Sequence, residues 1–294
     1  MSTTSIGPNL AAKVRDYYIL TKPEVNLLII MTTSAGYYLG GRGGLRWVGL
    51  VHTVLGTLLV ASGTATLNQF MERDYDAEMR RTASRPLPSG RVGANQALLF
   101  GLALSVLGAS YLWLAVNRLT AALATATLLS YLLIYTPLKR RTPLCTLLGA
   151  LPGAMPTLIG WAGASAGLDR ETWLLFTVLF LWQFPHFLAI ALMYREDYER
   201  AGFRMLPRFD REAHFTQAEI LGFTVGLVFT TLLPGFSTNV GWFYVLGMSA
   251  AGAFFLYYAL KLARSNSRAV ASRLLHASVL YLPVVLAVMM ICKR

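Results

Sequence analysis

The chain has 294 residues, of which 55% are hydrophobic and only 14% are charged, and its mean hydropathy is +0.51. A soluble domain carries about a quarter charged residues, so this chain has too few to cover a water-facing surface, and a soluble globular protein is excluded. A net charge of +12 is often found in nucleic-acid-binding proteins, but the Lys and Arg residues stand in short segments between apolar runs, which favours the positive-inside pattern of a membrane protein, and we expect no nucleic-acid partner.

Nine runs free of Asp, Glu, Lys and Arg have the length expected of membrane-spanning helices. A bilayer core about 30 Å thick needs roughly 20 apolar residues per helix. None of the runs alternates with the period of two that a membrane β-strand requires. We therefore predict an all-α membrane protein, a bundle of nine transmembrane helices. In chain order the predicted spans are 25–41, 47–67, 96–116, 119–138, 144–166, 172–194, 220–238, 241–260 and 274–292.

The distribution of basic residues predicts how these spans are oriented. If the N-terminal segment, residues 1–22, faces the cytoplasm, 20 of the 26 Lys and Arg residues fall in cytoplasmic segments and 6 fall outside. This bias follows the positive-inside rule, and adding or losing one span would remove it. We predict a single transmembrane domain, residues 1–294, embedded in the lipid bilayer of the cytoplasmic (inner) membrane.

Two of the predicted cytoplasmic segments are long, about 68–95 and about 195–219, and they follow the second and sixth spans. Long polar segments on one face of a bundle are where function tends to lie. We therefore expect the active site there, facing the cytoplasm.

The first long segment opens with Asn68, Glu72 and Asp76, each four residues after the last. If the preceding span continues as a helix, the three side chains lie within about 80° of one helix face and rise about 12 Å, while Asp74 points to nearly the opposite side. Mg²⁺ prefers such oxygen ligands and is usually bound by one or two carboxylates plus substrate phosphates. The alternative is a solvated loop in which acids simply alternate with arginines.

Acidic residues alone would repel a diphosphate, so basic side chains must lie close to them. The second long segment again carries a membrane helix into acids mixed with arginines, with Gly202 as a plausible stop. Two acid-bearing helix ends on one face could hold a metal–diphosphate between them. The candidate diphosphate-binding residues on this face are Arg81, Arg85, Lys139, Arg140 and Arg195.

Longer motifs surround both acidic segments. The first is Asn68-x-x-x-Glu72-x-x-x-Asp76, followed by Arg81-Thr82 and Arg85-Pro86-Leu87-Pro88-x-Gly90. The second is Trp182-Gln183-x-Pro185-His186-Phe187, followed by Tyr194-Arg195-x-Asp197-Tyr198 and Ala201-Gly202-x-x-Met205-Leu206-Pro207. In these motifs the chain resembles, over nearly its whole length, the intramembrane prenyltransferases of the UbiA family, and within that family the branch that acts on haem.

The sequence departs from the general pattern of the family at two places. Glu72 stands where the family usually has Asp, which replaces one carboxylate by another. The family's second motif usually has two acids four residues apart, whereas Asp197 is followed by Ala201. The resemblance therefore implies Asp197 as a metal ligand, with Glu196 and Glu199 as candidate assistants.

The resemblance also implies a reaction and its partners. A farnesyl group would pass from farnesyl diphosphate to the vinyl group of haem B, with addition of water, to give haem O; a haem A synthase is a candidate downstream partner. Mg²⁺ on Asn68, Glu72, Asp76 and Asp197, together with Arg and Lys side chains, would neutralise the charge on the departing diphosphate.

His186 is the one histidine of the four that lies deep within a predicted span. Because haem iron accepts imidazole, the resemblance makes His186 a candidate haem contact. The alternative, which is the commoner fate of such residues, is a hydrogen bond to a neighbouring helix.

Two other functions remain open from the sequence. A sister prenyltransferase that acts on a quinone or chlorophyll precursor would share the metal–diphosphate chemistry, and only the motifs around His186 and Asp197 separate it. A transporter would suit nine spans. It predicts polar pairs at the membrane midplane, however, and the predicted spans offer little beyond His186.

Overall fold

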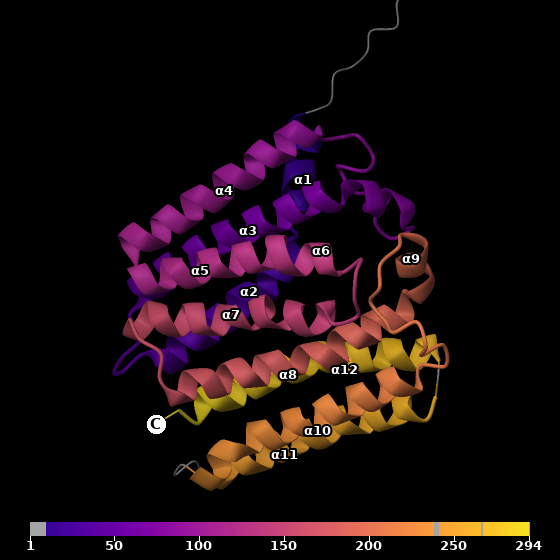
Figure 1. The fold of residues 1–294 in the computed structure, drawn as a ribbon. Coiled ribbons are helices and arrows are strands. Elements are labelled where there is room, and N and C mark those ends of the chain that lie inside the picture. The colour runs from indigo at the N-terminus through magenta and orange to yellow at the C-terminus, as the bar shows by residue number, and fades with distance from the viewer. Residues whose placement is uncertain (1–9, 238–240, 266, 294) are drawn as a thin grey trace, which may run out of the picture.

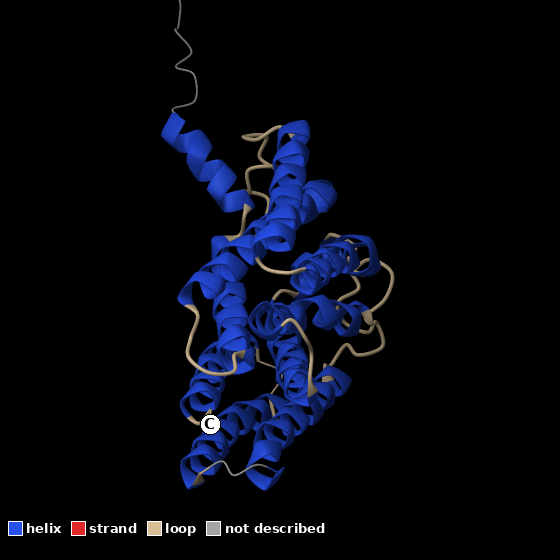
Figure 2. Cartoon of the chain, turned by 90° about the vertical axis from the view of Figure 1, so that its left-hand side faces the viewer, coloured by secondary structure: helices blue, strands red, loops and turns tan. Residues whose placement is uncertain are grey.

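The computed structural model describes residues 10–237, 241–265 and 267–293, which form helices and short connections and contain no strand (Figure 2). Residues 1–9 of the predicted N-terminal segment and residue 238 of the predicted span 220–238 lie outside this part. The helices are α1 (Leu10–Leu20), α2 (Pro23–Gly40), α3 (Trp47–Glu78), α4 (Ala94–Ala115), α5 (Arg118–Ser130), the π-helical turn η1 (Tyr131–Tyr135), α6 (Thr136–Leu138), α7 (Cys145–Ser165), α8 (Arg170–Met193), α9 (Arg195–Arg200), α10 (His214–Ser237), α11 (Trp242–Ala263) and α12 (Arg268–Ile291).

Eight helices of the described chain are long and apolar enough to cross a membrane, and they match eight of the nine predicted spans. They are α3, α4, the continuous helix Arg118–Leu138, α7, α8, α10, α11 and α12. The all-helical membrane bundle is therefore confirmed. The remaining predicted span, 25–41, forms α2, which is not among the eight because polar residues such as Asn26, Thr32 and Thr33 lower its hydropathy. These three side chains are buried against protein rather than exposed to lipid.

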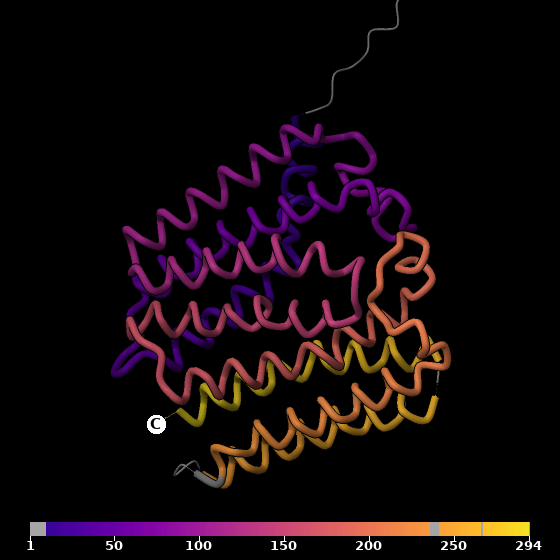
Figure 3. Tube along the Cα trace, viewed as in Figure 1, coloured from indigo at the N-terminus to yellow at the C-terminus, as the bar shows by residue number. Residues whose placement is uncertain are grey.

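The helices lie side by side, and the two long segments in which the sequence predicts the active site lie at one end of the bundle (Figures 1 and 3). The C-terminal ends of α3, α6 and α8 meet there, with α9 beside them. The α2–α3 and α7–α8 connections and the C-terminus lie at the opposite end. We call the first end the polar end.

The two long segments are shorter than predicted because the helices beside them are longer. Since α3 continues to Glu78, the first part of the predicted segment 68–95 is helical, and the irregular part spans 79–93. In the predicted segment 195–219, α9 and the start of α10 leave only 201–213 without a helix.

Glycine allows α2 and α7 to approach each other closely. A Cβ atom added to Gly160 would lie 2.0 Å from the carbonyl oxygen of Thr33, and one added to Gly36 would lie 2.4 Å from that of Thr157. In lipid, helices associate through such close contacts, because burial of apolar surface gives no advantage over contact with lipid tails. The contact fixes α2, and with it the residues just before α2, relative to the rest of the bundle.

We predict opposite effects of the same substitution at two helical glycines. Gly160→Ala should destabilise the protein by about 1–3 kcal/mol, because the methyl group meets a backbone oxygen that cannot rotate away. Gly222→Ala should be neutral or stabilise by up to about 1 kcal/mol, because open space surrounds Gly222 and Ala favours helix. Thermal unfolding in detergent measures both. Equal effects would show that the α2–α7 contact does not limit stability.

Candidate active site at the polar end

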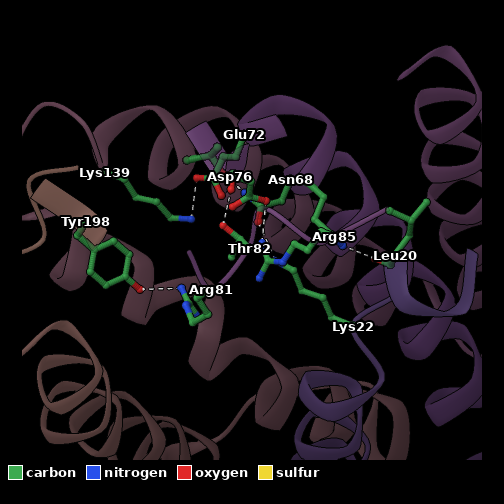
Figure 4. Close-up of polar contacts among 12 residues, drawn as sticks. Leu20, Lys22, Asn68, Glu72, Asp76, Arg81, Thr82, Arg85, Lys139 and Tyr198 are labelled. Carbon is green, nitrogen blue, oxygen red and sulfur yellow. Dashed lines mark hydrogen bonds and ion pairs between the residues drawn. The ribbon is translucent and has the colours of Figure 1, made fainter. Parts of the chain in front are cut away.

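Three polar side chains share the protein-facing side of α3 where it approaches the polar end (Figure 4). Asn68, Glu72 and Asp76 are only 1%, 8% and 2% exposed, whereas the side chain of Asp74 is 76% exposed. The spacing of four residues on a continuous helix therefore places them together, as predicted. The alternative of a solvated acidic loop is wrong for Glu72 and Asp76, whereas Asp74 and Glu78 are exposed. We call Asn68, Glu72 and Asp76 the carboxylate cluster.

Each member of the carboxylate cluster accepts a hydrogen bond from a cation (Figure 4). The bonds are 2.9 Å from Lys22 Nζ to Asn68 Oδ1, 2.9 Å from Lys139 Nζ to Glu72 Oε1, and 2.7 Å from Arg85 Nη1 to Asp76 Oδ2. A buried carboxylate without a partner charge would cost several kcal/mol, so these contacts make the cluster tolerable inside the bundle. Of the predicted diphosphate-binding residues, Arg85 and Lys139 thus lie at the cluster.

Lys22 also lies at the carboxylate cluster, although from the sequence it is only one of the basic residues of the N-terminal segment. It precedes Pro23, the first residue of α2, and has the left-handed φ of 51° that non-glycine residues rarely adopt. Burial, with Arg85 and Lys139 nearby, lowers its pKa to about 7. Its one sequence signal is a lysine placed directly before Pro at the start of an apolar run.

Lys139 is positioned by an irregular turn of helix. Pro137 has no N–H to donate, and before it the helix widens into the π-turn η1, where the Thr136 N–H bonds to the Tyr131 carbonyl. Lys139 Nζ then lies 4.5 Å from the ring centre of Tyr135 and 5.8 Å from that of Tyr131. Burial alone would lower the pKa of Lys139, but the Glu72 carboxylate and its hydrogen bond, together with Tyr135 and Tyr131, outweigh burial and hold that pKa well above its ordinary value. Lys139 is therefore a permanent cation.

The segments after α3 and after α8 are in contact. The Arg81 guanidinium donates to the Tyr198 hydroxyl at 3.2 Å (Figure 4). The rings of Tyr75 and Phe203 meet edge to face with centres 6.0 Å apart. Phe203 belongs to a small buried apolar group that also contains Met79. The two acid-bearing helix ends thus lie on the same side of the bundle and pack against each other.

Asp197 lies in this second segment, outside the carboxylate cluster. Its side chain is 13% exposed and forms an ion pair with Arg200 at 3.2 Å. Within the described residues, no three His, Cys, Asp or Glu side chains are close enough to hold a metal ion by themselves. A Mg²⁺ ion at the carboxylate cluster would therefore complete its shell with substrate phosphate and water, which is how Mg²⁺ usually binds. The oxygen atoms of the carboxylate cluster therefore suit Mg²⁺ if substrate phosphate and water supply its remaining ligands.

The two other predicted basic residues are engaged elsewhere. Arg195 donates to the backbone carbonyls of Asp210 and Arg211, at 3.0 and 2.6 Å, and so ties α9 to the segment 201–213. Arg140 is bonded to the Tyr75 hydroxyl, and its guanidinium lies 4.0 Å from the ring centre of Tyr75. Neither contacts the carboxylate cluster in this structure.

His186 lies in the interface between α8 and α12. Its Nδ1 is 2.8 Å from Ser278 Oγ, and its ring stacks on that of Trp182 with centres 4.6 Å apart. Trp182 in turn donates to the Ser278 carbonyl. The imidazole is thus held in place by one nitrogen, while Nε2 has no hydrogen-bonding partner among the described residues.

Comparison with known proteins identifies relatives along nearly the whole chain. Residues 29–282 match the UbiA prenyltransferase family. The chain is 47% identical to a protoheme IX farnesyltransferase from Solibacter usitatus, over 95% of this chain and 98% of that protein. It is 43% identical to a protoheme IX farnesyltransferase from Koribacter versatilis, over 97% and 95% of the two chains.

Solved structures share the fold at low sequence identity. A digeranylgeranylglyceryl phosphate synthase superimposes with a TM-score of 0.78 at 18% identity, covering 96% of this chain and 98% of that one. A UbiA homologue from Archaeoglobus fulgidus, in a structure bound to GPP and Mg²⁺, superimposes with a TM-score of 0.67 at 15% identity, covering 93% and 99%.

We predict that the buried ion pair between Lys139 and Glu72 contributes far more to the free energy of unfolding than an exposed ion pair on α3, the helix that carries Glu72. Lys139→Met should destabilise by about 3–5 kcal/mol, because it leaves a buried carboxylate unpaired, and adding Glu72→Gln should recover part of the loss. The matched control is the Arg73–Asp74 pair, whose coupling should not exceed about 1 kcal/mol. Double-mutant cycles from unfolding in detergent measure both couplings. Similar values would contradict the burial argument.

Proposed function

The chain belongs to the UbiA prenyltransferase family, and we propose that it transfers a farnesyl group from farnesyl diphosphate to the vinyl group of haem B, giving haem O and diphosphate. The high identity with protoheme IX farnesyltransferases over nearly the full length supports this substrate pair. The structural observation that carries the proposal is the carboxylate cluster, where two buried carboxylates and an amide oxygen are each bonded to a cation.

In the proposed reaction, the bond between C1 of the farnesyl group and the diphosphate oxygen breaks, and its electron pair leaves on the diphosphate. The terminal carbon of the haem vinyl group bonds to C1. Water then adds to the other vinyl carbon and releases a proton, which gives a hydroxyethylfarnesyl side chain. The negative charge that builds on the diphosphate is the feature that the protein has to stabilise.

We propose Mg²⁺ as the cofactor, with Asn68, Glu72, Asp76 and Asp197 supplying its protein ligands. When bound, Mg²⁺ would supply positive charge next to the diphosphate oxygens. Two buried carboxylates with an amide oxygen are the hard donors that this ion prefers. The homologue from Archaeoglobus fulgidus was solved with Mg²⁺ and GPP, which supports the same use of the fold.

The basic side chains at the carboxylate cluster would bind the diphosphate directly. Arg85 and Lys139, which the sequence predicts as diphosphate-binding residues, keep that role in this proposal, and Lys22 is added as a third. Charged donors bind phosphate oxygens strongly where water is excluded. Arg81, Arg140 and Arg195 remain proposed contacts of the diphosphate, although their bonds to Tyr198, Tyr75 and the 201–213 segment make them less direct candidates.

The aromatic rings beside Lys139 suit the organic part of the donor substrate. The rings of Tyr131 and Tyr135 meet edge to face with centres 4.9 Å apart. Both rings contact Lys139, which bonds to Glu72 of the carboxylate cluster. Aromatic faces attract cations. They would steady positive charge at C1 of the farnesyl group, while the apolar tail lies between helices or toward lipid.

The protein is a multi-pass membrane protein. We place it in the cytoplasmic membrane with the polar end facing the cytoplasm, because 20 of 26 basic residues fall on that side when the N-terminus is inside. A haem A synthase stays a candidate downstream partner. A quinone or chlorophyll precursor as acceptor would leave the likeness to protoheme IX farnesyltransferases without an explanation.

We predict that Asp76→Asn abolishes product formation while the protein still inserts and folds. The change removes a proposed Mg²⁺ ligand and should lower the rate by about 10²–10³-fold or more. The assay supplies purified protein with haem B, farnesyl diphosphate and Mg²⁺, and detects haem O by mass spectrometry. A chelator of Mg²⁺ should also abolish product.

The matched control for this experiment is Asp74→Asn on the same helix, because the Asp74 side chain is 76% exposed and lies outside the carboxylate cluster. It should keep near wild-type activity. Normal activity in Asp76→Asn would remove that residue from the proposed metal site. Absence of haem O with the wild-type chain would overturn the proposed reaction itself.

We further propose that His186 Nε2 contacts the haem iron, since Ser278 and Trp182 hold the ring while that nitrogen has no partner among the described residues. His186→Ala should weaken binding of haem B in detergent by about tenfold or more and shift the haem absorption spectrum. His276→Ala, an exposed histidine on the same helix as Ser278, is the control and should change neither. Unchanged affinity in His186→Ala would exclude an axial contact.

A further inference from the structure

A pocket lies at the polar end, on the side of α8 and α12. Its volume is about 650 Å³, and it extends from the end of α8 and the start of α9 to the start of α12. Its polar lining includes four arginines and two acids: Arg80, Arg81, Arg195, Arg268, Glu196 and Asp197. Positive charge therefore exceeds negative charge on its walls, which favours an anionic ligand.

Two of these arginines converge on one aromatic ring. The guanidinium of Arg81 lies 5.0 Å from the ring centre of Tyr194, and that of Arg268 lies 5.6 Å from it. Neither arginine forms an ion pair with a carboxylate in the described part of the chain. Two like charges held over one ring repel each other, and an anion between them would remove that repulsion.

The position of Arg268 is not explained by the stability of its own helix. Arg268 is the first residue of α12, where the helix dipole disfavours a cation. Ser267 caps this helix through its side chain, so Arg268 has no part in the cap. An arginine that opposes the dipole, lines a pocket and stacks on Tyr194 is better explained by a ligand than by folding.

The pocket and His186 lie along the same helix interface. Met193 and Ala271 line the pocket, from α8 and α12. His186 lies seven residues before Met193 on α8, and Ser278 lies seven residues after Ala271 on α12. Seven helical residues rise about 10 Å, so the His186–Ser278 contact lies two turns deeper in the interface than the pocket. This distance is similar to the distance between the iron of a haem and the carboxylates at its edge.

We propose that this pocket binds the two carboxylates of the acceptor, with Arg268 as their ion-pair partner; Arg81, Arg195 and Asp197, which the proposed function gives to the diphosphate and its metal, form the wall on the donor side. The inference rests on the proposed function, in which the acceptor is haem B, a macrocycle with two propionate groups at one edge. The planar guanidinium group matches a carboxylate through two parallel hydrogen bonds. The pocket thereby selects an acceptor that carries carboxylates.

The experiment combines a protein variant with a substrate variant. Wild-type protein and Arg268→Gln are each titrated in detergent with haem B and with its dimethyl ester, and the KM for farnesyl diphosphate is measured in parallel. The wild type should bind haem B about tenfold or more tightly than the ester. Arg268→Gln should lose that preference by weakening haem B alone, with little change in ester binding or in the KM for farnesyl diphosphate.

Two further variants sharpen the result. Arg264→Gln is the matched control, because Arg264 is exposed directly after α11 and does not line the pocket. It should behave as the wild type. Arg268→Lys keeps the charge but lacks the planar donors, and should fall between the wild type and Arg268→Gln.

Three results would overturn the carboxylate assignment: equal losses for haem B and the ester in Arg268→Gln, the same loss in Arg264→Gln, or an effect confined to the KM for farnesyl diphosphate. The last result would assign the pocket to the diphosphate instead. Binding is read without turnover, so the two proposals fail separately. A wild-type preference for haem B that Arg268→Gln removes, without any haem O formed, would support the pocket and contradict the proposed reaction.

Discussion

The site depends on charge compensation at buried carboxylates. Glu72 and Asp76 lie on the protein-facing side of a membrane helix, where unpaired charges would be strongly destabilising. Their cations come from different parts of the chain: Lys139 follows α6 and Arg85 follows α3, while Lys22, which bonds Asn68 beside them, precedes α2. One electrostatic requirement therefore ties three segments to the same face of α3.

This arrangement also prepares the site for an anion. Lys139 and Arg85 balance the two carboxylates, and Lys22, whose pKa is lowered to about 7, adds a further positive charge when it is protonated. In the proposed function, the carboxylates would hold Mg²⁺ and the cations would bind the diphosphate oxygens.

The sequence was informative where the physics is local. A spacing of four residues predicts a shared helix face, and the continuation of α3 to Glu78 confirms it for Asn68, Glu72 and Asp76. Lys22 could not be assigned in this way, because its bond to Asn68 joins residues that are 46 apart in the sequence. Arg195 shows the opposite case. It lies within one of the sequence motifs, but its guanidinium donates to backbone carbonyls of the 201–213 segment, and no local sequence pattern predicts the path of that segment.

Arg81 stands where the two halves of the chemistry would meet. It follows Asp76 by five residues and precedes Arg85 by four, so the chain that holds the carboxylate cluster also delivers Arg81 to the second acidic segment. There it bonds to Tyr198 and lies over Tyr194, on the wall of the α8–α12 pocket. A prenyl donor bound at the carboxylate cluster and an acceptor bound in that pocket would therefore lie on either side of Arg81. Any movement of the 79–93 segment would then change both sites together, because Arg85 and Arg81 belong to it.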